Sequence, residues 1–274
     1  MASLTEYGQR EFGLIGAGAV AASLVGKLAT KAGGLGPIVG VSYRVASRIA
    51  NTLRAGTAAR SAAALDPVRL VVFHSPPDQV DSLMEAAGSV EISWTGKNVL
   101  ILDCDPSHPV PAWFAARGAS VASVRNCGVP GRLRIEGSGP ALLVAQRVVR
   151  DLGMRAIEIP AGAERHFEAA ILAGTAALTP LIDQTVDLLR RCGMRDTEAL
   201  AVGSALFEQT ARAYGYSGRQ SWAWHNRAPE PAQIREQLQG IAEPLRPALR
   251  QLLLMGLASL DRHPEIATAI RGEA

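Results

Sequence analysis

The chain has 274 residues, 48% of them hydrophobic, and a formal net charge of +3, which suits a soluble α/β protein. Its basic residues are interleaved with acidic ones after Asp66, so the sequence predicts no nucleic-acid-binding patch. Three cysteines without metal or disulfide spacing, a polar start and no apolar run of membrane-spanning length favour a cytoplasmic protein without a metal site or membrane contact.

An apolar strand, predicted at residues 12–15, runs directly into the glycine-rich turn Gly16-Ala-Gly18-Ala-Val-Ala21. Gly16 permits a tight turn, Gly18 lets a pyrophosphate approach the backbone, and Ala21 lets a helix pack closely. That helix is expected over residues 19–31, and its N-terminus favours an anion. The pattern predicts a dinucleotide site, although a glycine turn that binds nothing is the alternative. The predicted contacts are Gly16, Gly18, Ala19 and Val20.

The end of the second predicted strand is basic and lacks acidic residues. Domains selective for NAD usually place Asp or Glu there to bind the ribose 2′-hydroxyl, but no acidic residue occurs within 12–65. Arg44 can pair with a 2′-phosphate, and Ser42 and Ser47 can donate hydrogen bonds to it. The stretch therefore predicts NADP(H), unless Arg44 is an ordinary surface arginine. The predicted contacts here are Ser42, Tyr43, Arg44 and Ser47, with Arg48 one turn later.

Strands continue to alternate with helices up to residue 160. Strands are expected at 69–74, 98–103, 119–124, 133–136 and 156–159, and helices at 45–53, 79–87 and 140–152. This alternation predicts a doubly wound, mainly parallel Rossmann sheet, an α/β domain over 1–160. Ligands bind beyond the carboxyl ends of such strands. That rule selects His74, Ser75 and Pro76 as candidate cofactor contacts, with a hydrogen-bonded strand-end histidine as the alternative for His74. It also selects Asp103, Cys104 and Asp105 after the next strand and Asn126 and Cys127 after the one that follows.

From residue 161 the pattern becomes helical and predicts an all-α C-terminal domain over 161–274. One long helix is expected from Glu164 to about Arg191, kinked at Pro180 and rich in alanine in its first half. Further helices are expected at 196–214 and 230–255 and near the end of the chain. An irregular aromatic segment between them contains Trp222, Trp224 and His225, which could cap a substrate cleft or pack between domains.

The chain resembles the 6-phosphogluconate dehydrogenase-like superfamily, most closely bacterial Rossmann-plus-helical-domain oxidoreductase-like proteins related to pyrroline-5-carboxylate reductase. The matching stretches begin at Gly13, Leu70, Ile135 and Phe167, the last being Phe-Glu-Ala-Ala where the family has Tyr-His-Ala-Ala. The resemblance implies NADP(H) binding, a homodimer formed through the helical domain and a site between the domains. It also implies that Ser75 and Pro76 lie along the nicotinamide ribose.

The start of the long helix supplies the candidates for proton transfer. Glu168 takes the place of the family's histidine and is the first choice as proton donor or substrate-orienting group, in a cleft that would bury it. Glu164, which stands where many members have lysine, lies on the same helical face, and His166 lies on another. The helix dipole alone also favours carboxylates in a first turn, which is the structural alternative.

Two classes of function follow from these residues. The first is an NADP(H)-dependent oxidoreductase that transfers a hydride between nicotinamide and a small carbonyl, imine or hydroxy-acid substrate. The second is a non-catalytic NADP(H)-binding sensor or scaffold protein, because the family's lysine and histidine are absent.

Overall fold

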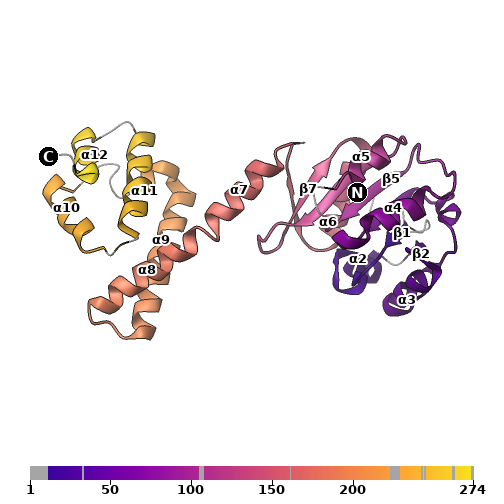
Figure 1. The fold of residues 1–274 in the computed structure, drawn as a ribbon, viewed down its shortest axis with the longest axis horizontal. Helices are drawn as coiled ribbons and strands as arrows, with labels where there is room; N and C mark the ends of the chain where they lie inside the picture. Colours follow the sequence, from indigo (N-terminus) through magenta and orange to yellow (C-terminus); the bar gives the residue numbers. More distant parts are fainter. Residues whose placement is uncertain are drawn as a thin grey trace. The chain divides into compact units, whose positions relative to one another are not determined.

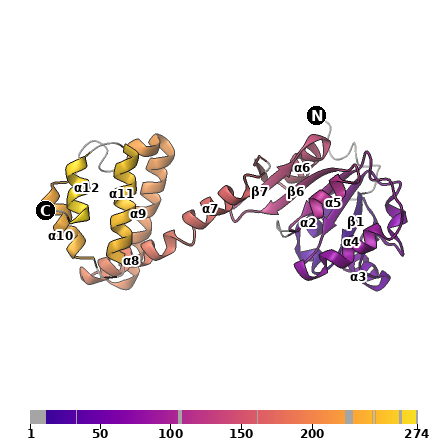
Figure 2. The same cartoon turned by 45° about the horizontal axis from the view of Figure 1, so that its top comes forward.

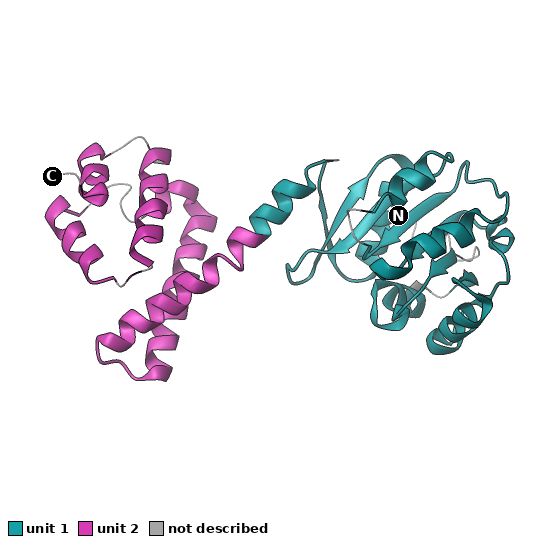
Figure 3. Cartoon of the chain, viewed as in Figure 1, with its two compact units in different colours: residues 1–171 teal, residues 172–274 magenta. Residues whose placement is uncertain are grey.

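The computed structural model describes residues 12–32, 34–104, 108–160, 162–222, 229–241, 243, 245–260 and 263–272. The chain forms two compact units, Met1–Ile171 and Leu172–Ala274, which Figure 3 shows in different colours. Asp105, Trp224 and His225 lie outside the described residues.

Unit 1 is built on an eight-stranded sheet (Figure 1). The strands are β1 Phe12–Gly16, β2 Leu35–Val39, β3 Thr57–Ala58, β4 Leu70–His74, β5 Asn98–Leu102, β6 Ser120–Asn126, β7 Arg132–Gly137 and β8 Arg155–Glu158. They lie in the order β3-β2-β1-β4-β5-β6-β7-β8, and the paired strands are parallel except for β6 with β7. This confirms the predicted doubly wound, mainly parallel sheet, whose order reverses between β1 and β4.

Helices cover both faces of this sheet (Figure 2). The helices on one face are α2 Leu24–Ala32, α3 Tyr43–Leu53 and α6 Gly139–Asp151; those on the other are α4 Val80–Gly88 and α5 Val110–Ala115. Successive strand residues face opposite cores, so Leu14 packs with the first set and Ile15 with the second. Burial on both faces explains why these strands read as continuous apolar runs.

The helix after the glycine turn begins later than the sequence predicts. Residues Val20–Ala22 form the 3-10 turn η1, Ser23 is extended, and α2 starts at Leu24. The Ser23 hydroxyl accepts a hydrogen bond from the Val25 N–H at 3.1 Å, which caps α2 at this point. A bound anion would therefore meet the amides of the turn before it met the first amides of α2.

The long helix predicted from Glu164 to Arg191 is two helices, α7 Glu164–Gly174 and α8 Leu178–Arg191. Pro180 falls in the first turn of α8, where its missing N–H removes no helical bond. In a continuous helix its ring would clash with the carbonyl of residue 176, and the backbone is interrupted there. The break thus precedes the proline instead of coinciding with it.

The residues 164–191 also correct the expectation that no apolar run reaches membrane-spanning length. This stretch contains an 18-residue window of mean hydropathy 1.2, of which 6% is buried. Length and composition alone are weak evidence for a membrane span, and the helical break divides the stretch.

Unit 2 consists of helices in the described residues, as predicted (Figure 2). Besides α8 they are α9 Asp196–Ser217, the 3-10 turn η4 Gly218–Ser221, α10 Pro231–Gln239, α11 Leu245–Leu260 and α12 Pro264–Arg271. Helix α8 packs on α9, and a Cβ on Gly203 would lie 2.8 Å from the Val186 Cγ2. A separate small core holds α10, α11 and α12 together through Ile234, Leu238, Leu257, Ile266 and Ile270.

Candidate functional site

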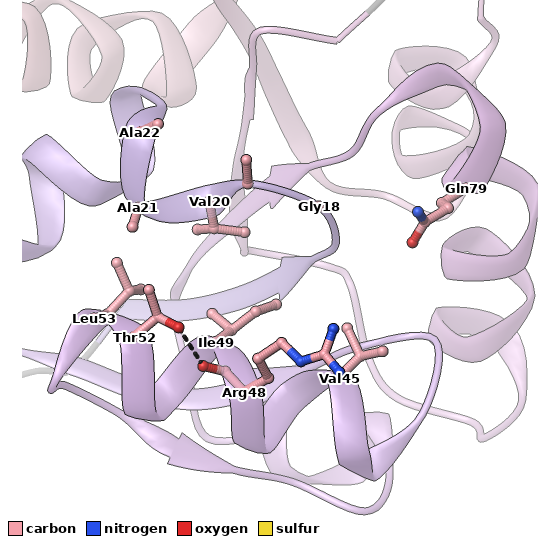
Figure 4. Close-up of a pocket in the computed structure, with 11 residues that line it drawn as sticks. Gly18, Val20, Ala21, Ala22, Val45, Arg48, Ile49, Thr52, Leu53 and Gln79 are labelled. Carbon is pink, nitrogen blue, oxygen red and sulfur yellow. Dashed lines mark hydrogen bonds between the residues drawn. The ribbon is translucent and has the colours of Figure 1, made fainter.

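A cavity of about 590 Å³ opens between the glycine turn and α3 (Figure 4). Gly18 to Ala22 form one wall, residues of α3 from Val45 to Leu53 form the other, and Gln79 borders it from the turn after β4. Figure 4 shows the Arg48 guanidinium extending along α3 beside Val45. The cavity thus combines exposed backbone of a glycine turn with one cationic side chain, a pairing that suits a phosphate-bearing ligand.

Gly18 has the conformation that the fingerprint requires. Its φ is +75°, and a Cβ built there would lie 3.0 Å from the Pro76 Cδ. Next to it, the Ala17 N–H donates to the His74 carbonyl at 3.1 Å, and this hydrogen bond joins the turn after β1 to the end of β4. A side chain at position 18 would disturb both turns.

Some of the predicted cofactor contacts line this cavity, and others lie outside its lining. Gly18, Ala19 and Val20 line the cavity, as does Arg48. The cavity-lining residues of the described chain do not include Gly16, Ser42, Tyr43, Arg44 or Ser47. The Ser42 hydroxyl instead accepts from the Val45 N–H at 3.3 Å and caps α3.

Tyr43 and Arg44 stand in the first turn of α3, exposed to solvent. The Arg60 guanidinium carbon lies 4.4 Å from the centre of the Tyr43 ring, a cation–π contact. Arg44, Arg48 and Arg60 therefore make the surface around the start of α3 strongly basic.

The residues after β4 hold the turn rather than face the cavity. His74 is buried, and its Nδ1 lies 3.0 Å from the Leu102 carbonyl, so an Nδ1–H tautomer would donate to that oxygen. The Ser75 hydroxyl donates to the Pro76 carbonyl at 2.8 Å. The Leu102 carbonyl is thus the hydrogen-bond partner expected for His74 if it is a structural strand-end histidine.

A second cavity, of about 240 Å³, lies at the carboxyl end of β6. The lining residues are Asn126, Cys127, Gly128, Arg134, Phe167, Glu168 and Ile171. It brings together Asn126 and Glu168, which the sequence placed at one site from a strand end and a helix start. Its described lining includes neither Glu164 nor His166, and His166 is exposed.

Two arginines that the sequence analysis missed hold α7 against the sheet. Arg125 on β6 and Arg134 on β7 are directly opposite each other in the antiparallel ladder. Glu164 Oε1 accepts from Arg125 Nη1 at 2.7 Å and from Arg134 Nη2, and Glu168 Oε1 accepts from Arg134 Nη1 at 2.9 Å. Like charges placed opposite each other repel, so the two carboxylates are what make this pair tolerable.

The environment of Glu168 differs from the buried cleft that was expected for it. Its side chain is 58% exposed in the single chain and bonded to a guanidinium. Arg134, by contrast, is buried. Arg134 lies on the face of β7 opposite Leu133 and Ile135, where alternation along a strand often places a solvent-exposed residue.

Asp103 connects the surroundings of the two cavities. It has a left-handed backbone, with φ +54°, and follows β5. Its carboxylate accepts from the Leu24 N–H at the start of α2 and from the Asn126 N–H at the end of β6, each at 3.4 Å. In the described part of the chain, no three His, Cys, Asp or Glu side chains gather where they could hold a metal ion.

No protein-family model matches this sequence, and no curated protein does either. Solved structures do match over most of the chain. An imine reductase from Aspergillus terreus, in complex with NADPH4 and dibenz[c,e]azepine, is 17% identical, with 96% of this chain and 91% of that one covered and a TM-score of 0.61. A reductive aminase from the same organism, in complex with NADPH and ethyl levulinate, is 18% identical over 97% and 99%, with a TM-score of 0.57.

An imine reductase from Myxococcus stipitatus, in complex with NADP+, is 17% identical over 96% of this chain and 93% of its own, with a TM-score of 0.52. These likenesses extend over both units and show a shared fold. It is the fold that the resemblance to the 6-phosphogluconate dehydrogenase-like superfamily implies, a Rossmann sheet followed by a helical region.

Proposed function

We propose that this protein is a soluble, cytoplasmic NADP(H)-dependent oxidoreductase that transfers a hydride between nicotinamide and a small carbonyl, imine or hydroxy-acid substrate. The observation that carries the proposal is the cavity whose walls are the glycine turn and α3, with Arg48 as its cationic side chain. Gly18 has the positive φ that the fingerprint turn needs, and a Cβ there would press on the Pro76 ring. The matched imine reductases and reductive aminase, in complex with NADPH4, NADPH or NADP+, support the same cofactor.

The cofactor's 2′-phosphate is the group that Arg44 and Arg48 would recognise. Both stand on α3, four residues apart and so on the same face, and no acidic residue between 12 and 65 competes for them. Ser47 lies between them in sequence and Tyr43 precedes them. The nicotinamide of a bound cofactor would supply or accept the hydride. These residues of α3 would fix the adenosine end of the same cofactor.

Arg48→Ala and Arg44→Ala are each expected to weaken NADPH binding by about 1.5–3 kcal/mol, because each removes a charge-assisted hydrogen bond to the 2′-phosphate. NADH has no such phosphate, so its affinity should stay nearly constant. Calorimetric titration of both cofactors measures the difference. Lys27→Ala removes an exposed cation from the neighbouring α2 and serves as the control. Equal affinity of the unmodified protein for NADPH and NADH would contradict the assignment.

On the substrate side, Glu168 is proposed as the proton donor or substrate-orienting group, a role it can take once a ligand has released it from Arg134; Glu164 and His166 are the neighbouring candidates. Glu168 and Asn126 line one cavity at the sheet's carboxyl edge, where ligands of such folds bind. Stopped-flow measurement of NADPH oxidation against a panel of imines and oxo acids tests the chemistry. NADPH binding without oxidation by any of these compounds would favour the sensor or scaffold function. The ion pairs of Glu164 and Glu168 with Arg134 support that alternative, because they give both carboxylates a structural role.

A homodimer formed through the helical unit would cover its exposed apolar side chains, which include Leu172, Leu200, Tyr214 and Met255. Light scattering at micromolar concentration is expected to give twice the mass of one chain. Leu172→Glu should shift the mass toward that of a single chain, because it places a charge in the apolar surface. Leu143→Glu, on α6 of the other unit and equally exposed, is the matched control and should leave the dimer intact. A single-chain mass for the unmodified protein would refute the dimer.

A further inference from the structure

The second cavity has the composition of a small anion site. Arg134 is 4% exposed, and its guanidinium carbon lies 5.5 Å from the centre of the Phe167 ring. Ile171 adds an apolar wall, and the volume of about 240 Å³ admits only a small molecule. A buried guanidinium beside apolar side chains favours a compact ligand with one negative group and one apolar part.

Two carboxylates already occupy Arg134, but they are held differently. Glu164 receives hydrogen bonds from both Arg125 and Arg134 and is mostly buried. Glu168 receives one bond, from Arg134 Nη1 at 2.9 Å, and its side chain is 58% exposed. Glu168 thus makes a single bond from the solvent-exposed side of the pair, and water can solvate its carboxylate when that bond breaks. Glu168 is therefore the partner that a ligand can replace.

We propose that Arg134 binds the carboxylate of a small organic acid, which takes the place of Glu168 on Nη1. Asn126 stands on the same cavity wall, and its Oδ1 already accepts from the Gly128 N–H at 3.0 Å. Its amide NH₂ is then the group that it offers to the second carboxylate oxygen. Phe167 and Ile171 receive the ligand's apolar part.

This assignment names a substrate class for the proposed reductase: oxo acids or imines that carry a carboxylate. Only that last step rests on the proposed function. The binding site itself rests on Arg134, its exchangeable partner and the cavity, and it can be measured without cofactor or turnover.

Calorimetric titration of the full chain with 3-methylbutanoate tests the site, with 3-methylbutanamide as a neutral ligand of the same shape. The acid is expected to bind at least about tenfold more tightly, because only the carboxylate makes charge-assisted bonds. Arg134→Lys keeps the charge but loses the planar fork, and should weaken binding of the acid by about tenfold. Equal affinity for the acid and the amide would overturn the proposal.

Glu168→Gln gives the sharper result, and it decides the matter alone if Arg134→Lys does not fold. Removing the competing carboxylate should tighten binding of the acid by about twofold to fivefold. Glu208→Gln, which removes an exposed carboxylate paired with Arg212 in the other unit, should change nothing. Unchanged or weaker binding by Glu168→Gln would overturn the exchange. If 3-methylbutanoate binds but no imine or oxo acid of the panel oxidises NADPH, only the proposed reductase function is rejected. If the panel oxidises NADPH but 3-methylbutanoate does not bind, only this site is rejected.

Discussion

Lys97→Met is expected to lower the free energy of unfolding by roughly 2–4 kcal/mol, because it leaves buried carbonyl groups without a donor. The Lys97 ammonium donates to the carbonyls of Leu65, Asp66 and Val68 at 3.2, 2.5 and 2.8 Å. Methionine keeps the apolar stem but supplies no hydrogen bond. Urea unfolding measures the loss, and Lys27→Met, at an exposed site, is the control. A loss no larger than that of Lys27→Met would contradict the structural role of Lys97.

Lys97 also makes the free energy of unfolding depend on pH in the alkaline range. Burial lowers the pKa of Lys97 below its ordinary value of 10.5, although the nearby Asp66 opposes this. Between the lowered pKa and 10.5, the unfolded chain binds the proton that the folded chain has lost. The stability of the unmodified protein should therefore rise with pH in this window, relative to Lys97→Met. A difference that stays constant or falls as pH rises would contradict the direction.

Gly18→Ala is expected to weaken NADPH binding by about 100-fold or more. Alanine at φ +75° is strained, and its Cβ would lie 3.0 Å from the Pro76 Cδ, so the turn that lines the cavity would have to shift. Together these costs come to about 3 kcal/mol. Calorimetry with NADPH measures the effect, once thermal unfolding has shown that the variant folds.

Gly96→Ala is the matched control for this change. Gly96 has φ +77°, almost the same backbone conformation, but a Cβ there would meet no atom within 4 Å. It should cost some stability and leave NADPH affinity unaltered. Equal losses of NADPH affinity in the two variants would mean that Gly18 does not face the cofactor.

The sequence was sufficient for the long strands of the sheet because they carry strong signals, but not for β3, whose two residues form no apolar run. Strands such as β4 and β5 are buried on both faces, so each appears as an uninterrupted apolar run. The glycine turn was equally legible, since Gly18 has the positive φ that its place in the fingerprint demands. The start of α2 was misplaced because Ser23 caps it by a local hydrogen bond that alanine-rich periodicity does not reveal.

The second cavity could be predicted only in part. Strand ends and helix starts pointed to Asn126 and Glu168, but nothing in the pattern indicated Arg134 as their neighbour. Its burial depends on pairing with carboxylates that are 30 and 34 residues away in the chain. Such a long-range ion pair replaces the outward orientation that alternation along a strand would otherwise indicate.

Asp103 limits how this protein can change in evolution. One side chain holds the backbone of Asn126, which lines the second cavity, and of Leu24, two residues beyond the wall of the first, so a substitution there would loosen both connections together. Its left-handed backbone further restricts the acceptable residues, and aspartate and asparagine are the types that combine this conformation with the needed acceptor oxygen. Lineages in which either cavity changes are therefore expected to keep aspartate or asparagine at position 103.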